Sequence, residues 1–376
     1  MLVLAAAMLI MVMGFVAFTL DVGFITLTKS QLQVAADAAA HSASMELQPQ
    51  FYKDSPLTAA EAETNARNEA VAMAARHKAG ERDSVYADLN RDVRVGNYSY
   101  DSGTGTWVKQ WGVAPYNMVE VTLRRDQVSA ADGTPNAGGD KPLPLFFAPV
   151  IGHETAYLAE KSTAAILAGG GFKVIPGQTA GVLPITVEEQ TWDNLIDNNI
   201  GDDLWTYNEE TGEVTAGADG IREINLYPAA TGSSGNFGTV DFGGANNSTA
   251  DLSRQILYGL NESDLSYFPN GELRFDGVPM ELNGDTGISA GIKDELDAIM
   301  GQPRAIPVYS SVVGNGNNAT YTIVKFVGIR IVEVKLTGGN KRVVVQPAPF
   351  SDHSVVPGNV TVDTDNTIFT TARMIQ

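Results

Sequence analysis

Cysteine is absent from the 376 residues of the sequence, and histidine is rare. Without cysteine the chain has no disulfide framework, no thiol nucleophile and no cysteine-ligated zinc. This absence is compatible with an oxidising exterior but does not prove one, because export requires no disulfides. The histidines, His41, His77, His153 and His353, are far apart and have no second ligand at metal spacing. We therefore expect surface or interface roles for them.

Recognised catalytic motifs are also missing. There is no HExxH, no Walker A sequence, and "GSSGNFG" lacks the GxSxG pattern of a nucleophile elbow. Acidic pairs such as Glu188-Glu189 and Asp202-Asp203 are expected on solvated surface, because side chains adjacent in sequence usually diverge. We predict no catalytic residue and expect that the protein is not an enzyme.

Basic residues are few, with 25 Lys and Arg against 44 Asp and Glu, for a formal net charge of −19. The acidic residues are spread along the chain, which is typical of a solvated surface. A nucleic-acid binder would need a clustered basic face, whereas Arg124-Arg125 and Lys341-Arg342 lie inside apparent strands. We expect no nucleic-acid partner.

Two acidic loops leave one cofactor alternative open. "NGDTG", Asn283–Gly287, and "DTDN", Asp363–Asn366, offer alternating oxygen ligands of the kind that Ca²⁺ prefers. Neither loop has a full EF-hand pattern. We expect no metal site and no cofactor, with Ca²⁺ as the alternative.

Charge is lacking altogether from residues 1–20, where Thr19 is the only polar side chain. Such a helix has about the length needed to cross a ~30 Å hydrocarbon layer. A cleavable signal peptide is disfavoured, because no positive region precedes the apolar run and the helical pattern continues beyond any plausible cleavage site. A transmembrane anchor and the core helix of a filament subunit, lipid-exposed before assembly and packed against copies of itself afterwards, both fit. The chain begins on the apolar run as a processed prepilin would, which favours the filament.

The helical pattern continues through Leu27 and Leu32 into the alanine-rich run 35–40, interrupted by Asp37. A helix from Met1 to about Leu47 would be ~70 Å long, longer than any bilayer is thick. Its distal half must lie against the globular part of the same chain or against another subunit. Gly14 and Gly23 are candidate bend points.

Asp21 ends the apolar run, and burying its carboxylate among helices would be costly without a partner. In a filament, the amino terminus or Lys29 of a neighbouring subunit would suit. Alternatively, Asp21 marks the boundary between membrane and water. The residues expected at an assembly interface are Leu2, Leu4, Leu9, Ile10, Met13, Phe15, Phe18 and Asp21.

The N-terminal segment resembles that of the TadE/TadG-like family of Flp (tight adherence, Tad) pilus-associated proteins. These proteins typically have a membrane-type helix, an Asp-Val-Gly, and a Leu-Gln followed by Ala-Ala-Asp-Ala-Ala-Ala. The matching residues are Asp21, Val22, Gly23, Leu32, Gln33 and Ala35 to Ala40. The likeness covers about 47 residues. The later segments "PLPLFFAPVIG", "GVLPITVEEQTWDNL", "SSGNFGTVDFGG" and "IPVYSSVVGNGNNATYTIVKFVGIRI" also resemble parts of TadG-like envelope proteins.

The resemblance implies a cell-envelope or cell-surface role in pilus biogenesis, or a pilus-like subunit. Two features depart from related proteins. The Asp-x-Ser-x-Ser metal motif of the von Willebrand A module in larger family members is absent, and residues 1–6, "MLVLAA", lack the glutamate that type IV pilins carry near their mature amino terminus.

Beyond residue 47 the pattern predicts one further helix and then mostly strands. Thr58 and Glu61 form a capping box for a helix over 58–79. Alternating residues predict strands around 92–111 and 117–126, a buried apolar run at 143–152 and a strand at 155–167. The segment 168–177, "AGGGFKVIPG", is predicted to be a linker.

The remaining sequence predicts a second unit. Residues 188–205 suit a helix or loop, and helical spacing predicts amphipathic helices at 248–260 and 288–300. The stretch 321–347 predicts an antiparallel hairpin, and one or two strands close the chain.

We therefore expect an α+β fold with a long N-terminal hydrophobic helix followed by antiparallel β-rich globular domains. The predicted divisions are 1–47, the helix; 48–167, a helix plus a β-rich domain; and 168–376, a second α+β domain. The favoured function is a structural subunit of an extracellular pilus-like filament, an adhesive homopolymer assembled through the N-terminal helix. The alternative is a single-pass, membrane-anchored Tad pilus assembly factor of the bacterial envelope. Expected partners are identical subunits, the inner membrane before assembly, and the pilus secretion machinery.

Overall fold

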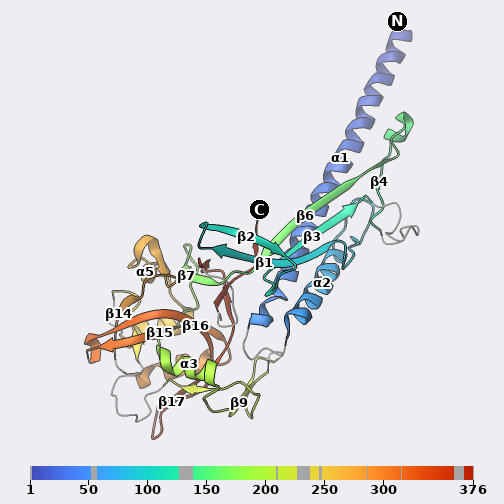
Figure 1. The fold of residues 1–376 in the computed structure, drawn as a ribbon. Coiled ribbons are helices and arrows are strands. Elements are labelled where there is room, and N and C mark those ends of the chain that lie inside the picture. The colour runs from blue at the N-terminus through green and yellow to red at the C-terminus, as the bar shows by residue number, and fades with distance from the viewer. Residues whose placement is uncertain are drawn as a thin grey trace.

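The longest element is a single helix that projects from the rest of the molecule (Figure 1). The computed structural model describes residues 2–51, 57–126, 139–208, 211–226, 238–244, 248–285, 287–314, 316–359 and 368–375. Helix α1 spans Leu2–Met45 without interruption. Its glycines, Gly14 and Gly23, do not break it, and no proline occurs in it. The predicted continuous rod is confirmed.

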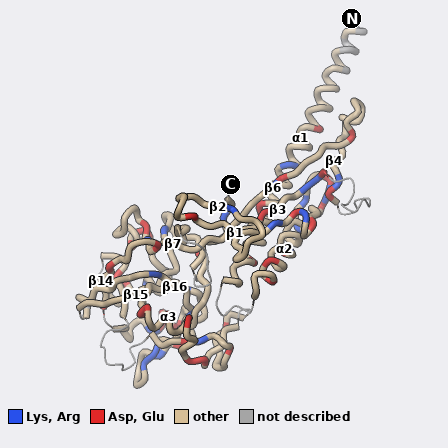
Figure 2. Tube along the Cα trace, viewed as in Figure 1, with Lys and Arg blue, Asp and Glu red and all other residues tan. Residues whose placement is uncertain are grey.

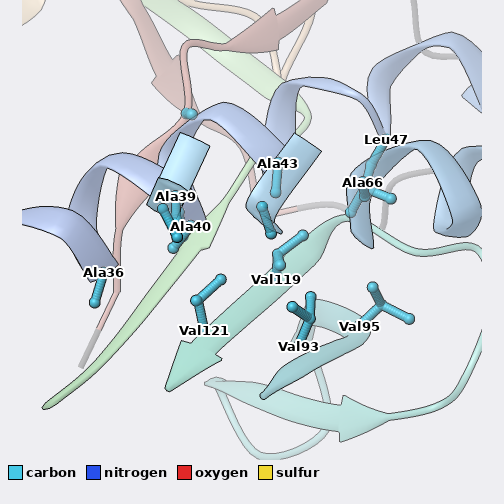
Figure 3. Close-up of a cluster of buried hydrophobic side chains, with 14 of the residues drawn as sticks. Ala36, Ala39, Ala40, Ala43, Leu47, Ala66, Val93, Val95, Val119 and Val121 are labelled. Atoms are coloured by element: carbon cyan, nitrogen blue, oxygen red, sulfur yellow. The ribbon is translucent and has the colours of Figure 1, made fainter. Parts of the chain in front are cut away.

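The C-terminal half of α1 packs on the face of a five-stranded antiparallel sheet of the same chain. The strand order is β2-β1-β3-β6-β21. Their bounds are β1 Val93–Asp101, β2 Thr106–Trp111, β3 Met118–Arg125, β6 Leu158–Ala165 and β21 Arg373–Met374. The side chains of Ala36, Ala39, Ala40 and Ala43 from this half of α1 meet Val93, Val95, Val119 and Val121 of the sheet, and Leu47, just beyond the end of the helix, joins the same cluster (Figure 3). Alanine allows the helix backbone to approach the sheet closely, which fixes α1 firmly to its own globular part.

Helix α2, Ala59–Ala75, lies beside α1 and completes this layer. The Thr58 hydroxyl oxygen accepts the backbone N–H of Glu61, and the backbone N–H of Thr58 donates to the Glu61 carboxylate. Ala62, Ala66 and Ala70 are fully buried. The predicted capping box is confirmed, the small buried residues let α2 pack closely on α1, and the helix ends a few residues before the expected position.

A second sheet has seven strands and forms the centre of the C-terminal region. The path is β11-β17-β16-β14-β12, with β15 paired to β16 and to β8. The bounds are β8 Val187–Glu188, β11 Ile224–Asn225, β12 Thr239–Val240, β14 Met280–Asp285, β15 Pro303–Val313, β16 Ala319–Lys335 and β17 Arg342–Pro347. The predicted hairpin is confirmed as β16 and β17.

Helices cover one face of this second sheet, and a three-stranded sheet covers the other. The helices are α3 Glu189–Asn198, α4 Thr249–Tyr258 and α6 Lys293–Ala298, and both predicted amphipathic helices are present. Along β15, Ile306 and Val308 enter the helical core, while Ala305 and Tyr309 enter the opposite core. This alternation is the period of two expected for a strand buried on both faces.

The segment predicted to be a linker is a strand instead. Residues Gly169–Lys173 form β7, the central strand of the sheet β13-β7-β19, with β13 Glu272–Arg274 and β19 Val355–Pro357. A Cβ added to Gly170 would lie 2.3 Å from the Cα of Gly358 and 2.7 Å from Oδ2 of Asp276. The glycines therefore serve close approach of neighbouring backbone rather than flexibility.

The C-terminal residues return to the first sheet. Phe369 lies in the core beneath α1, with its ring 5.6 Å from that of Phe51, and β21 pairs with β6. The remaining paired strands are β4 Leu143–Pro144 with β5 Thr155–Ala156, β9 Trp205–Tyr207 with β10 Val214–Ala216, and β18 Phe350–Asp352 with β20 Ile368–Thr370. Short helical turns are η1 Gln48–Phe51, η2 Ala148–Ile151, α5 Glu262–Leu265, η3 Pro269–Gly271, η4 Ala290–Ile292 and η5 Gly316–Asn318.

The predicted fold class is confirmed: a long apolar N-terminal helix precedes antiparallel β-rich regions. Of the two loops considered for Ca²⁺, Asp363–Asn366 lies outside the described residues, and Asn283–Gly287 overlaps the paired strand β14. Across the part of the chain that is described, no group of three or more histidines and carboxylates is placed to hold a metal ion.

Candidate membrane-anchoring and assembly site

The N-terminal half of α1 stands clear of the globular part of the chain. Among the described side chains of this half, the large apolar ones are more than half exposed to solvent: Leu4, Met8, Leu9, Met11, Val12, Met13, Phe15, Val16, Phe18 and Leu20. The side chains of Leu2 and Ile10, which were also predicted at an assembly interface, lie outside the described part. A helix that is apolar all round suits lipid or the middle of a helix bundle, and not water.

The exposed N-terminal segment of α1, residues 2–20, which we call the bare segment or bare helix, has a length that fits a bilayer. Residues 2–20 of α1 extend ~28 Å at ~1.5 Å per residue, which is close to the ~30 Å thickness of a hydrocarbon core. Among the described helices, the N-terminal helix alone is long and apolar enough by composition to span a membrane, and only 11% of its most apolar stretch is buried in the protein. The contact that this surface needs must come from outside the chain.

Asp21 ends the bare segment and joins α1 to a distant loop. Its side chain is 3% exposed. Its carboxylate accepts hydrogen bonds from the backbone N–H groups of Phe146, Phe147 and Ala148, at 2.8, 3.0 and 2.6 Å. These donors supply the partners that a buried carboxylate requires. Asp21 thus has hydrogen-bond donors within its own chain, and its contact with a neighbouring subunit's amino terminus or Lys29 stays a prediction.

The loop that Asp21 holds is a hairpin-like arm, residues 143–156, which we call the apolar arm. It leaves the first sheet and lies alongside α1 (Figure 1). The sequence predicted a buried run here, but Phe146, Phe147, Val150 and Ile151 are exposed. The prediction was wrong because apolar composition does not distinguish a core strand from a projecting apolar loop.

A shallow apolar groove separates the arm from α1. It has a volume of about 490 Å³ and is lined by Thr19, Leu20, Gly23, Phe24, Leu27, Phe146 and Phe147. The ring centroids of Phe24 and Phe146, two of these residues, are 5.0 Å apart. No carboxylate or ammonium group lines the groove, so it suits an acyl chain or an apolar side chain.

Charged residues begin where the bare helix ends. Asp21 is the first charge along α1, and Figure 2 shows the N-terminal part of the helix free of Lys, Arg, Asp and Glu. The next charge is Lys29, which pairs with Glu160 of β6 at 3.4 Å while remaining 61% exposed. Lys29 is therefore an intramolecular contact at the surface. The division between apolar and charged surface coincides with the junction between bare and packed helix.

Within the packed half, Asp37 interrupts the alanine run for a structural reason. Its Oδ1 accepts hydrogen bonds from Gln33 of the same helix and from the hydroxyl of Ser162 on β6, both at 2.7 Å. Gln31 similarly accepts the backbone N–H of Gly80 at 2.8 Å. These polar contacts fix the rotation of α1 about its own axis relative to the sheet. The face of the helix that carries Asp21 is thereby directed toward the apolar arm.

Residues 1–50 match a protein family model. The family is described as "Putative Flp pilus-assembly TadE/G-like". The match confirms the resemblance seen in the sequence and covers α1, including Asp21 and the alanine run. The later segments that resemble TadG-like proteins lie outside the matched range. No curated protein and no solved structure matches the chain.

The match and the apolar helix together indicate a pilus-related, membrane-associated protein of the cell envelope. The sequence alone located the apolar segment and the position where it ends. It missed the apolar arm and the partners of Asp21, because these contacts join residues 125 or more positions apart. The uncharged stretch 142–152 was the only signal, and it was interpreted as core.

Proposed function

We propose that the protein is an anchored component of a Tad-type pilus system. Residues 2–20 hold it in the membrane, and the globular part lies outside the lipid, where it contacts other parts of the pilus machinery. One observation carries this proposal: the apolar segment is exposed on all sides, and the globular part begins at its end, at Asp21. We place the anchored component ahead of the filament subunit because Asp21 has partners within its own chain.

Energetics support lipid contact. Transferring a Leu, Met or Phe side chain from water to an apolar environment is favourable by about 1.5–3 kcal/mol. Many such side chains are exposed on this part of α1, so the bare helix would drive strong association with any apolar phase. The backbone polar groups of the segment are already satisfied within the helix, as a lipid environment requires.

Membrane extraction tests the anchor. Membranes from cells that produce the full chain are washed with alkaline carbonate, and the protein is followed by immunoblotting. We expect the wild-type chain to stay in the pellet. Met13→Arg should weaken retention, because arginine at the centre of a spanning helix costs about 2.5–3.5 kcal/mol for insertion. Val278→Arg places the same charge on an exposed apolar residue of the C-terminal region; it is the control and should remain in the pellet. Complete extraction of the wild-type chain would refute the anchor.

The second candidate is a structural subunit of a pilus-like filament, assembled through Leu4, Leu9, Met13, Phe15 and Phe18 together with Leu2 and Ile10. Its specific support is that the bare helix is apolar on every face, which also suits packing against sister helices. In this case the membrane would hold the subunit only before assembly. Electron microscopy of native material distinguishes the two: fibres with a subunit repeat favour the filament, and discrete detergent-bound particles favour the anchored component.

We further propose that the protein has no catalytic activity. The support is the lack of any recognised catalytic motif in the sequence. Hydrolase and transferase screening of the detergent-solubilised full chain would overturn this proposal if it gave a turnover that a carboxylate variant abolished.

A further inference from the structure

We propose that the apolar arm, residues 143–156, is a second lipid contact that enters the boundary between headgroups and acyl chains beside α1. The proposal rests on the membrane anchor proposed above. It assigns a role to the exposed apolar surface of the arm, which is needed neither for a single spanning helix nor for a globular part in water.

The arm is a defined structure and not a loose loop. β4 and β5 pair at its base, with Leu143 opposite Ala156. Further out, the N–H of Leu145 donates to the carbonyl oxygen of Glu154, and the N–H of His153 donates to that of Ala148. Gly152, at φ +89°, closes the turn after η2 in a left-handed conformation that favours glycine. The exposed apolar side chains are therefore held in place by a closed hydrogen-bonded frame.

The contacts of the arm place its tip at the end of the bare helix. At its base, Leu143 lies against Gly80, which also lies against Thr28 of α1. Farther along, the ring of Phe146 packs on Phe24, and the N–H groups of residues 146–148 bind Asp21. Moving outward along the arm thus means moving from residue 28 to residue 21 of α1, or ~10 Å toward its N-terminus at ~1.5 Å per residue. The tip reaches the level where the membrane-spanning segment would meet the headgroups.

The chemistry of the tip fits a lipid surface. Val150 is 88% exposed and Ile151 is 71% exposed, beside the exposed rings of Phe146 and Phe147. No charged residue occurs in the stretch 142–152. A contiguous exposed apolar patch of this kind marks an interaction site. The patch is continuous with the apolar surface of α1 through the groove at Phe24, so whatever phase surrounds the helix also meets the arm.

As the partner of the arm, we favour a lipid surface over an acidic surface or a soluble protein. The tip carries no cation to attract anionic headgroups, and the protein has a net charge of −19. Insertion would therefore depend on apolar transfer and only weakly on lipid charge. With two attachment points, the helix and the arm, the tilt and rotation of α1 would be fixed relative to the bilayer. The globular part would then present a constant face away from the membrane.

The absence of native cysteine makes a direct test simple. Three single-cysteine variants of the full chain, Val150→Cys, Val278→Cys and Phe15→Cys, are spin-labelled and reconstituted at low density in vesicles of a zwitterionic phosphatidylcholine. Accessibility to oxygen, which concentrates in lipid, is compared with accessibility to a water-soluble nickel chelate. Val278 is the matched control, since it is 86% exposed and lies between β13 and β14. Phe15 reports on the anchor.

We expect the ratio of oxygen to nickel accessibility to be several-fold higher at position 150 than at position 278, and highest at position 15. Adding anionic lipid should change the value at position 150 little. A ratio at position 150 equal to that at position 278, with position 15 in lipid, would overturn the arm proposal and leave the anchor intact. An aqueous signal at position 15 would overturn the anchor itself. Shielding at position 150 only at high protein density would identify a second copy of the chain as the occupant and would also overturn the proposal.

Discussion

At the scale of single residues, Asp21 has the most consequential contacts of α1. A carboxylate at the end of an apolar helix can mark a boundary, meet a partner protein or bind backbone amides, and the sequence does not distinguish these uses. The structure assigns it to three N–H groups of the apolar arm. One side chain thereby defines the end of the bare helix and holds the arm beside it.

Replacing this carboxylate should release the arm. We expect Asp21→Ala to leave the three amide groups without their acceptor and to lower the local stability of residues 145–152 by about 1–3 kcal/mol. Hydrogen exchange by mass spectrometry, on protein in detergent, would show faster exchange in this segment. Thr19→Ala is the control, because the Thr19 hydroxyl donates only to the carbonyl oxygen of Phe15 in its own helix. Unchanged exchange in the arm of Asp21→Ala would show that these hydrogen bonds are dispensable.

A second residue-scale prediction concerns Glu223 in the C-terminal region. Burial raises the pKa of this carboxyl, and the nearby charge of Asp219 adds to the rise, while backbone N–H donors from Leu204 and Trp205 oppose it. The folded state therefore binds the proton more tightly than the unfolded state. Stability should fall as the pH rises from the ordinary glutamate pKa through the raised value.

Asp219→Asn tests this cause. The amide oxygen can still accept the N–H of Ile221, as Oδ1 of Asp219 does, but the negative charge is lost. We expect the pKa of Glu223 to move down toward its usual range and the decline in stability with pH to weaken. NMR titration of the Glu223 carboxyl measures the first effect. Asp203→Asn, in the same loop region, should leave that pKa in place, and an equal shift in both variants would contradict the assignment to Asp219.

At the scale of secondary-structure elements, the same residue type has different roles in different settings. Alanines that are merely helix formers in sequence become the contact surface between α1, α2 and the first sheet. Glycines that look like a linker become the central strand of a sheet. In each case the structural role of the small residue depends on the element that packs against it.

The N-cap of helix α2 tests whether a local sequence motif contributes to stability. We expect Thr58→Ala to destabilise the protein by about 1 kcal/mol, because the N-terminal N–H of Glu61 loses its capping oxygen. Chemical denaturation followed by circular dichroism measures the change. Thr64→Ala makes the same replacement in the middle of the same helix, where the hydroxyl donates to Ala60, and should be nearly neutral. Equal losses for both variants would indicate that the cap contributes nothing special.

Strand β7 tests whether close packing between neighbouring strands contributes to stability. We expect Gly170→Ala to destabilise the fold by about 1–3 kcal/mol, since the new methyl group would overlap the backbone of Gly358. The thermal midpoint of the full chain in detergent is the measurement. Gly339→Ala is the matched control, because a Cβ there would meet nothing within 4 Å and the backbone carries no positive φ. A Gly170→Ala protein as stable as this control would mean that the sheet accommodates the methyl group.

At the scale of the whole molecule, one end of the chain is bare helix and the other end ties the globular part together. Residues 368–375 contribute to both the core beneath α1 and the strand pairing of the C-terminal region. The C-terminus therefore connects two sheets that are distant in sequence. The mounting of α1 depends on residues at the far end of the chain.

This connection predicts a long-range effect of a single substitution. We expect Phe369→Ala to cost about 3–5 kcal/mol, by removing a large side chain packed against Phe51. Hydrogen exchange should accelerate both around η1 and in β18, the strand that pairs with β20. Phe275→Ala, within the C-terminal core, should accelerate exchange in that region alone. An effect of Phe369→Ala confined to one region would show that the two sheets unfold independently.

Much of the fold follows from local patterns. The capping box, the β1–β2 and β16–β17 hairpins and the amphipathic helices α4 and α6 all occur where periodicity and turn residues predict them. Two segments did not follow, the strand at 169–173 and the exposed arm at 143–156. Whether each segment forms a strand or an exposed loop depends on the elements beside it in space, and local composition does not specify these neighbours.

The sequence by itself determined that water cannot solvate residues 1–20 and that the apolar stretch ends at Asp21, because the hydrophobicity and length of a continuous segment are local properties. Only the tertiary structure decided that Asp21 binds the arm, that the arm exposes Val150 and Ile151, and that α1 is mounted on its own sheet. These arrangements arise from contacts between residues more than a hundred positions apart, whose geometry is set by packing and hydrogen bonding in the folded chain.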